Sequence, residues 1–473
     1  MRTRFTPLAI AAAGVMLCCS AAPADEGSSV LSYLDGGHLS CRAELSLGFL
    51  YGAGARPDAL GTPVGTLRAG AAAATGNPAG LGFLTSGEIL LDGSPGVGAS
   101  VNELLDAEAR AASEIDEAIE DVADDDIDIT YPELDTWAGQ KGGVLSGAAA
   151  VPVGPVTVAI AIEEPVNLDL RIVDTGIEAL AETVKSEGDA SIEITARCFL
   201  DAAGDVSLRV EKTTLAAGAR LAPAVSVGAA LSRVTARASL SGVVRGDGIV
   251  DYGGQEYAFN DPGDPWHNEL GASAEGTFEG SGIGWTAGVS WRPSGRFAVD
   301  LAYSRAPDLS LEGSLTTVEN TIPAVSEDGV DVELISASQP TLTEETITVE
   351  DDPVGLELPS YLGAAVSARA GILLATLEYR RFGDTIAYEY DGEAEGIDLG
   401  SALGLELDIG GFWAGGGFVQ GTLLPDDGGQ REAVTVPFAN VGFGVPLGDN
   451  VRLDTLILAV PVQVMRLSVS CRL

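Results

Sequence analysis

Apolar and polar residues alternate with a period of two from about residue 144 to the C-terminus. The clearest runs are residues 285–291 and 297–303, which a very short turn separates, and residues 361–369 and 372–381, which meet at another. Successive side chains of a β-strand point to opposite faces, so each run has one apolar face and one face of small or polar residues. The pattern therefore predicts antiparallel hairpins over most of the chain.

The apolar face of these hairpins can contact one of two environments. In a water-soluble β-sandwich it packs into a shared core, whereas in a membrane barrel it faces the lipid. Tight short turns together with long acidic loops, such as residues 246–270 and 318–353, favour the barrel. The roughly 330 residues after position 144 accommodate about 14 strands, and the barrel must close because an open edge would leave backbone groups unpaired in lipid.

The register of the alternation assigns individual side chains to the two faces. The lipid-facing set shares the apolar side of its runs and consists of Trp285, Val289, Val299, Leu301, Leu467 and Val469. Ser290, Ala302 and Ser468 stand on the opposite side. An arginine near the bilayer midplane should cost about 2–4 kcal/mol on the lipid face and less on the lumen face.

The first 24 residues have the order of a secretory signal peptide. Two arginines give a basic start, an apolar run follows, and Ala22-Pro23-Ala24 is a small-x-small cleavage pattern. The apolar run is shorter than the about 20 residues that a membrane-spanning helix needs. Lipidation at Cys18 is the alternative, and it is disfavoured because the bulky Leu17 precedes that cysteine.

The region before the alternating runs is more varied. Residues 38–52 have the pattern of a strand that leads into a Gly- and Ala-rich stretch over 53–98. Apolar residues spaced by three or four predict a helix over 101–122 and a second short helix over 175–186. The first helix is expected to end in a polar loop at Ala123-Asp124-Asp125-Asp126.

The charge of the chain excludes one class of partner. The 69 Asp and Glu residues outnumber the 26 Lys and Arg residues, which gives a net charge of −43. Removal of the signal peptide leaves 24 basic residues against 69 acidic ones, or −45. Binding to nucleic acid requires a basic surface, so we expect no nucleic-acid partner. Disorder of the whole chain is also excluded, because 46% of the residues are hydrophobic.

Three ordered motifs carry a resemblance to a known family. They are Asn77-Pro78-Ala79-Gly80-Leu81; the hairpin from Gly284-Trp285 through Trp291-Arg292-Pro293 to Leu301-Ala302-Tyr303-Ser304; and Leu358-Pro359-Ser360-Tyr361-Leu362-Gly363 followed by Leu377-Glu378-Tyr379-Arg380-Arg381. Together they span about 300 residues and resemble the FadL-type family of outer-membrane transporters of long-chain fatty acids and hydrocarbons. Residues 100–250 match that family poorly.

The resemblance implies an all-β fold, an antiparallel transmembrane β-barrel of about 14 strands with an N-terminal hatch. Asn77, Pro78, Ala79, Gly80 and Leu81 would lie in that hatch. The physical reading agrees, because proline fixes the backbone and lacks an N–H, and irregular backbone at membrane depth is tolerated only inside protein. The implied function is passive uptake of hydrophobic or amphipathic small molecules across the outer membrane, by a chain that is expected to be a monomer in contact with outer-membrane lipid.

The expected organisation has four parts: the signal peptide (1–24), an N-terminal strand and hatch segment (25–98), an acidic helical insertion and loop (99–143), and the transmembrane barrel (144–473). The sequence departs from the family in two ways, since a strand precedes the hatch and the chain ends in Leu473 rather than Phe or Tyr. The helical insertion resembles TraF-like relatives. The alternative function is therefore a structural or assembly barrel with a closed lumen.

Other chemistry is weakly indicated. The acidic stretches at 124–128 and 261–264 lack the full spacing of a calcium loop, and His267 has no nearby Cys or second His for a metal site. The sequence contains no GxSxG elbow and no HExxH motif. We therefore expect no enzyme activity, no catalytic or metal-binding residues and no cofactor.

The lumen would distinguish transport from a structural role. A pocket walled by apolar side chains near Asn77 would favour transport, whereas a lumen filled by charged pairs would favour a structural barrel. We expect residues from about 60 to 98 to fold inside the barrel. There the Asn77 amide must find hydrogen-bond partners, because an unsatisfied buried amide costs about 1–3 kcal/mol.

Overall fold

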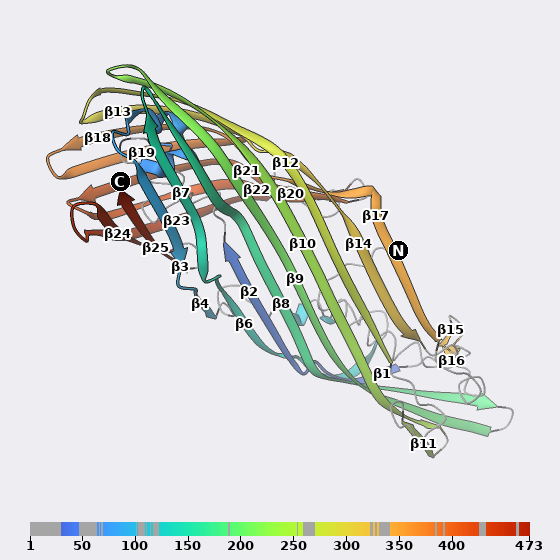
Figure 1. Ribbon diagram of the computed structural model, residues 1–473. Coiled ribbons are helices and arrows are strands. Elements are labelled where there is room, and N and C mark those ends of the chain that lie inside the picture. Colours follow the sequence, from blue (N-terminus) through green and yellow to red (C-terminus); the bar gives the residue numbers. More distant parts are fainter. Residues whose placement is uncertain are drawn as a thin grey trace.

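The computed structural model describes residues 30–46, 64–65, 67, 70–100, 102, 109, 111–113, 115–116, 123–187, 190–252, 254–258, 270–321, 325–326, 329–330, 341–383, 386–390, 393–424, 432–459 and 463–473. Nearly all of them belong to one sheet, mostly antiparallel, that closes on itself as a barrel (Figure 1). Among these residues, no helix is long and apolar enough to cross a membrane.

The closed wall consists of fourteen strands, three of which are each interrupted and so are made of two consecutive segments. Six single strands come first: β3 (Glu88–Ser94), β7 (Gly143–Val153), β8 (Val156–Glu187), β9 (Ala190–Ala222), β10 (Val225–Tyr252) and β12 (Leu270–Ser294). The three interrupted strands come next. They are β13 (Phe297–Arg305) continued by β14 (Asp308–Thr321), β17 (Thr341–Glu357) continued by β18 (Ser360–Ala370), and β19 (Leu373–Gly383) continued by β20 (Ile386–Tyr390). The last five are β21 (Glu393–Ile409), β22 (Phe412–Leu424), β23 (Glu432–Pro446), β24 (Val451–Ala459) and β25 (Gln463–Arg472). β25 pairs antiparallel with β3 and closes the barrel.

The two predicted hairpins and their facing are confirmed. β12 pairs with β13, and β18 pairs with β19, each pair across a short turn. Trp285, Val289 and Leu301 are 42%, 45% and 51% exposed, whereas Ser290 and Ala302 are buried. Exposed large apolar side chains recur in this way around the wall and form an apolar belt. A closed barrel with such a belt is an outer-membrane protein.

Replacing Leu301 with arginine should lower the free energy of unfolding by about 2–4 kcal/mol, because the charged group would enter the hydrocarbon. The control Leu301→Met keeps an apolar side chain and should cost less than about 1.5 kcal/mol. Urea unfolding in lipid vesicles measures both, and equal midpoints would show that Leu301 does not face lipid. The expectation that arginine costs less on the lumen face stays a prediction, and the burial of Ser290, Ala302 and Ser468 argues against it, because an arginine side chain there would displace its neighbours.

Three wall strands are far longer than a membrane crossing requires. β8, β9 and β10 contain 32, 33 and 28 residues, and at about 3.3 Å per residue β9 is about 110 Å long. One end of the sheet therefore projects beyond the apolar belt, toward the lower right of Figure 1. We call it the outer extension: residues 166–187 of β8, 190–210 of β9 and 235–252 of β10 with their neighbours. The short turns lie at the opposite end, which is periplasmic in barrels of this kind.

The outer extension includes segments for which the sequence predicted other structure. Residues 175–186 are part of β8 rather than a helix, and they pair with β1 (Val30–Asp35) on one side and β9 on the other. Two neighbours satisfy the backbone groups of this segment on both edges, which outweighs its helical spacing. The acidic stretch from Ala123 to Asp126 begins β5 (Ala123–Thr130) and is a strand rather than a loop.

Strands also replace much of the expected acidic loops. β10 continues to Tyr252 and pairs with β11 (Gln255–Ala258), and the two ends of the second expected loop, residues 318–321 and 341–353, belong to the paired strands β14 and β17. The helix expected at 101–122 is present at those of its positions that the structure describes.

The N-terminal strand lies within the wall of the outer extension. β2 (His38–Ser46) pairs antiparallel with β8 and parallel with β6 (Glu133–Gln140). β6 in turn pairs with β4 (Val97–Ser100), which continues the line of β3. The strand predicted at 38–52 is thus present to Ser46, and residues 47–52 lie outside the described residues.

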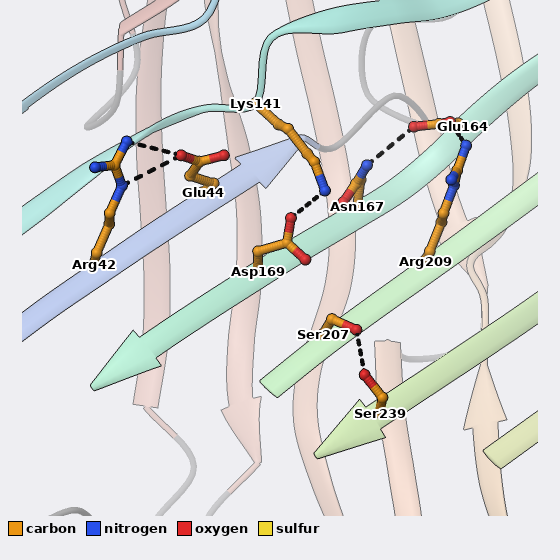
Figure 2. Close-up of polar contacts among 9 residues, drawn as sticks. All are labelled: Arg42, Glu44, Lys141, Glu164, Asn167, Asp169, Ser207, Arg209 and Ser239. Carbon is orange, nitrogen blue, oxygen red and sulfur yellow. Dashed lines mark hydrogen bonds and ion pairs between the residues drawn. The ribbon is translucent and has the colours of Figure 1, made fainter. Parts of the chain in front are cut away.

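Charged side chains cover the solvent face of the outer extension just beyond the apolar belt. Figure 2 shows them on β2, β8 and β9 and at Lys141, together with the uncharged Asn167, Ser207 and Ser239. Glu44 accepts from Arg42 at 3.0 Å, Lys141 pairs with Asp169, and Arg209 pairs with Glu164. Such exposed pairs contribute about 0–1 kcal/mol each, so their main effect is to keep this surface hydrated and outside the lipid.

A buried carboxyl in the outer extension predicts a pH dependence. Burial raises the pKa of Asp174 to about 6, against weaker opposing effects of the Thr175 backbone N–H and of His38. Because the folded pKa is above the unfolded one, stability is greatest below about pH 4 and falls as the pH rises toward 6. We expect the extension to resist proteolysis better at pH 5 than at pH 7, and Asp174→Asn to remove the difference. A difference that survives Asp174→Asn but not His38→Gln would assign it to the histidine.

Candidate functional site

A short irregular segment packs against the inner face of the wall near its periplasmic end. We call it the internal segment, residues 70–84, which contains the 3-10 helices η1 (Gly70–Ala74) and η2 (Pro78–Phe83). Asn77 caps η2, because its Oδ1 accepts from the Ala79 N–H at 3.2 Å, and Pro78 occupies the first helical position, where its missing N–H costs nothing.

The wall is built from small residues where it meets this segment. Gly218, Gly228 and Gly288 are register partners on β9, β10 and β12, and the row continues through Ala302 to Gly363 on β18. A Cβ on Gly228 would overlap the backbone of Pro78, and one on Gly288 would overlap the Asn77 side chain. The wall glycines therefore create the space in which η2 lies.

Asn77 is fully buried and its amide is satisfied. Its Nδ2 donates to the Val64 carbonyl at 3.0 Å and to the Leu301 carbonyl of the wall at 3.4 Å. The expectation that Asn77 makes side-chain hydrogen bonds inside the barrel is thus met by the geometry. Two further bonds tie the segment to the wall: Ser226 Oγ donates to the Ala79 carbonyl at 2.7 Å, and the Tyr361 hydroxyl donates to the Gly76 carbonyl at 3.3 Å.

Apolar packing completes the attachment. Leu81 and the four alanines of η1 are buried against small wall residues, among them Ala148, Ala159 and Ala216. Burial of a leucine side chain contributes about 1.5–3 kcal/mol. The segment inside the barrel is shorter than the expected range 60–98, because residues 88–94 form wall strand β3 between β7 and β25.

The opposite half of the lumen is filled with charge pairs. Arg380 Nη2 lies 2.6 Å from Glu378 Oε1 with both side chains almost fully buried, and Arg466 pairs with Asp92 in the same way. Other inward polar residues on this side are Asp300, Glu406, Asp408, Asn440 and Asp454, all buried. At the level of the internal segment, this half of the described inner wall is therefore lined by buried polar side chains.

A cavity of about 60 Å³ lies directly above the internal segment, on its extracellular side. Thr75 lies at its floor, and Tyr361 and Phe382 contribute aromatic walls. Lys212 Nζ and Glu163 Oε1 form an ion pair at 2.8 Å on its edge. The sequence offered one signal for this pair, since Lys212 is one of three lysines in the chain and stands on the inward phase of its strand.

Above the cavity the inner face becomes apolar. The apolar lining consists of Val166, Val210, Val234, Ala236, Phe278, Leu309, Leu311, Leu356 and Leu358, which are buried together. They come from β8, β9, β10, β12, β14 and β17, and Val234 and Leu358 also border the cavity. The inner face therefore carries a buried apolar cluster on the extracellular side of the cavity and buried charge pairs beside the internal segment.

Metal binding finds no support among the described residues, where no group of three or more His, Cys, Asp or Glu side chains could hold an ion. The acidic stretch at 261–264 and His267 lie outside the described residues.

The sequence matches no family model and no curated protein. Solved structures are similar to it in shape. A Pseudomonas aeruginosa FadL homologue is 12% identical, with 91% of this chain and 98% of that chain covered and a TM-score of 0.46. The P. putida toluene transporter TodX is 11% identical over 90% and 99% of the chains at a TM-score of 0.43, and the Ralstonia pickettii toluene transporter TbuX is 13% identical over 85% and 94% at 0.38.

Proposed function

We propose that the protein is a passive outer-membrane channel for hydrophobic or amphipathic small molecules, such as long-chain fatty acids or hydrocarbons. Asn77, Pro78, Ala79, Gly80 and Leu81 form its hatch. The observation that carries this proposal is the apolar lining, a buried cluster on the inner face of the wall that borders the cavity above the internal segment.

An apolar inner face is costly in a barrel that only needs a water-filled or permanently closed lumen. Its value is in binding, because burial of apolar ligand surface contributes about 25 cal/mol per Å². A molecule that enters from outside would be held against the apolar lining and stopped at the internal segment. The cavity of about 60 Å³ is much smaller than ligand sites of about 300–1,000 Å³, so passage requires the segment to shift.

The contacts of the internal segment suit a hatch. It is held by a few hydrogen bonds from Asn77, Ser226 and Tyr361 and by small apolar contacts. It makes no strand pairing with the wall, so it can move without breaking the ladder of the barrel.

Replacing Asn77 with alanine tests the proposal. The change removes the hydrogen bonds to Val64 and Leu301 and should weaken docking of the segment by about 1–3 kcal/mol. We expect faster uptake of a labelled long-chain fatty acid and easier protease cleavage within 60–98 in intact outer membranes, with normal barrel assembly. Asn167→Ala is the matched control, because Asn167 is also a buried amide but its Nδ2 donates to Glu164 Oε2 at 3.0 Å in the wall and not to the internal segment (Figure 2).

The structural barrel with a closed lumen is the second candidate, and the buried charge pairs are the observation that favours it. It predicts that no apolar molecule passes in wild type or in either variant. Unchanged uptake in Asn77→Ala, together with a segment that proteases cut as freely in wild type, would favour this candidate over transport.

A further inference from the structure

The cavity above the internal segment has polar borders that uptake of a pure hydrocarbon does not require. Lys212 and Glu163 border it as an ion pair, with Nζ and Oε1 2.8 Å apart. Their side chains are register partners on the inward phase of β9 and β8 and remain 19% and 12% exposed, so the exposed part of each faces the cavity. Within the described structure the Lys212 ammonium donates only to Glu163, which leaves two of its three N–H donors for an occupant.

Hydroxyl groups extend these polar borders along the wall. Ser232 Oγ lies 2.8 Å from Thr214 Oγ1, and Thr286 Oγ1 lies 3.0 Å from Ser304 Oγ. All of these except Thr214 border the cavity. Each pair uses one O–H as donor, so the other hydroxyl can still donate to an occupant. A cavity of about 60 Å³ with several polar partners suits water or a small polar group.

The cavity also has apolar borders. Val234 and Leu358 belong both to the cavity and to the apolar lining, and Phe382 adds an aromatic ring. A volume of about 60 Å³ is far below that of a site for a whole ligand. An amphipathic molecule would therefore place only its head group in the cavity and lay its apolar part against the lining.

The ion pair discriminates among head groups by charge. Lys212 and Glu163 are together neutral and present a donor beside an acceptor. A ligand carboxylate would lie beside the Glu163 carboxylate, and a ligand ammonium beside the Lys212 ammonium, so either charge would meet a like charge in a poorly solvated place. A hydrocarbon would leave the polar groups of the cavity without partners. A hydroxyl group can accept from the ammonium and donate to the carboxylate.

We infer that the cavity is a head-group site for uncharged molecules that carry a hydroxyl group, namely apolar alcohols and phenols. The ligand oxygen accepts from Lys212 and its O–H donates to Glu163, while the rest of the molecule contacts Val234 and Leu358. The inference rests on the proposed function and deepens it, because it places alcohols and phenols ahead of both acids and hydrocarbons as ligands.

The test compares three probes with the same ring system: 1-naphthol, naphthalene and 1-naphthoate. Each is titrated at pH 7 into the full mature chain in lipid nanodiscs and followed by its own fluorescence, and empty nanodiscs measure partition into lipid. Wild type should bind 1-naphthol about tenfold more tightly than naphthalene or 1-naphthoate, as expected for a hydrogen bond to a charged group.

A double variant locates the preference. Lys212→Met with Glu163→Gln replaces the ion pair by neutral side chains of similar volume and leaves no charge without its partner. It should bind 1-naphthol no more tightly than naphthalene. Lys141→Met with Asp169→Asn is the matched control, because that ion pair lies on the solvent face (Figure 2), and it should keep the tenfold preference. Heat-modified mobility on a gel checks assembly of both.

The comparison of probes in wild type needs no variant and decides first. Equal affinity for 1-naphthol and naphthalene, or tighter binding of 1-naphthoate, would overturn the head-group site. A preference for 1-naphthol that survives the change of Lys212 and Glu163, or that is lost equally in the control, would overturn it too. Each of these results leaves the proposed uptake intact, whereas failure of wild type to bind any of the three probes would overturn the proposed function together with the site.

Discussion

Gly228→Ala should open the barrel to small molecules without unfolding it. A Cβ at this position would overlap the carbonyl carbon and oxygen of Pro78 and the nitrogen of Ala79, which are backbone atoms that no rotamer change can move away. Overpacking of this kind costs about 1–3 kcal/mol, and here the least costly relief is displacement of the internal segment. The displaced population should rise about 5- to 150-fold.

Gly242→Ala is the control for this experiment. It makes the same change on the same strand, but its Cβ would meet only the Ala203 carbonyl oxygen, at 3.9 Å. Conductance in planar bilayers and dye uptake by cells measure opening, and heat-modified gel mobility measures assembly. If the two variants conduct alike, the segment does not close the lumen, and the wall glycines have another role.

Glu378→Ala should strongly destabilise the barrel. Arg380 and Glu378 are 1% and 0% exposed, and removal of one partner of a buried ion pair costs about 3–5 kcal/mol, because the other charge stays desolvated. The measurement is the urea midpoint of the folded, heat-modifiable form in vesicles.

An exposed ion pair provides the control for Glu378→Ala. Arg237 Nε and Glu279 Oε1 lie 2.8 Å apart with side chains 61% and 65% exposed, so Glu279→Ala should cost no more than about 1 kcal/mol. The double change Glu378→Leu with Arg380→Met should recover much of the lost stability, since an apolar pair of similar volume avoids the desolvation cost. Similar effects of Glu378→Ala and Glu279→Ala would show that the lumen is hydrated around Arg380.

The membrane-level wall could be predicted from sequence because its signal is local. Alternation places Leu301 outside and Ala302 inside within a single strand, and short turns fix the pairing of its neighbours. Asn77-Pro78 is likewise a local signal, since a capping side chain and a proline at the next position determine the start of η2 wherever it lies. These features need no knowledge of distant residues.

The outer extension could not be predicted in the same way. Residues 175–186 have helical spacing in Ile177, Leu180 and Val184, and their strand structure depends on pairing with β1, almost 150 residues away. The Lys212–Glu163 pair also joins residues from separate strands. Only the register of the closed barrel brings such residues together, and one sequence does not specify that register.

The place of β1 and β2 has a consequence for the two ends of the chain. Val30 pairs with Glu182 near the tip of the outer extension, whereas the Leu473 N–H donates to the Gly87 carbonyl at the periplasmic rim. The first described residue, Val30, and the last, Leu473, therefore lie on opposite sides of the membrane. If residues 1–24 are cleaved as the sequence predicts, an epitope tag inserted just before Val30 should be stained by antibody on intact bacteria, and one fused after Leu473 should be reached only after the envelope is permeabilised. The fold can thus display a passenger peptide at the cell surface from its N-terminus.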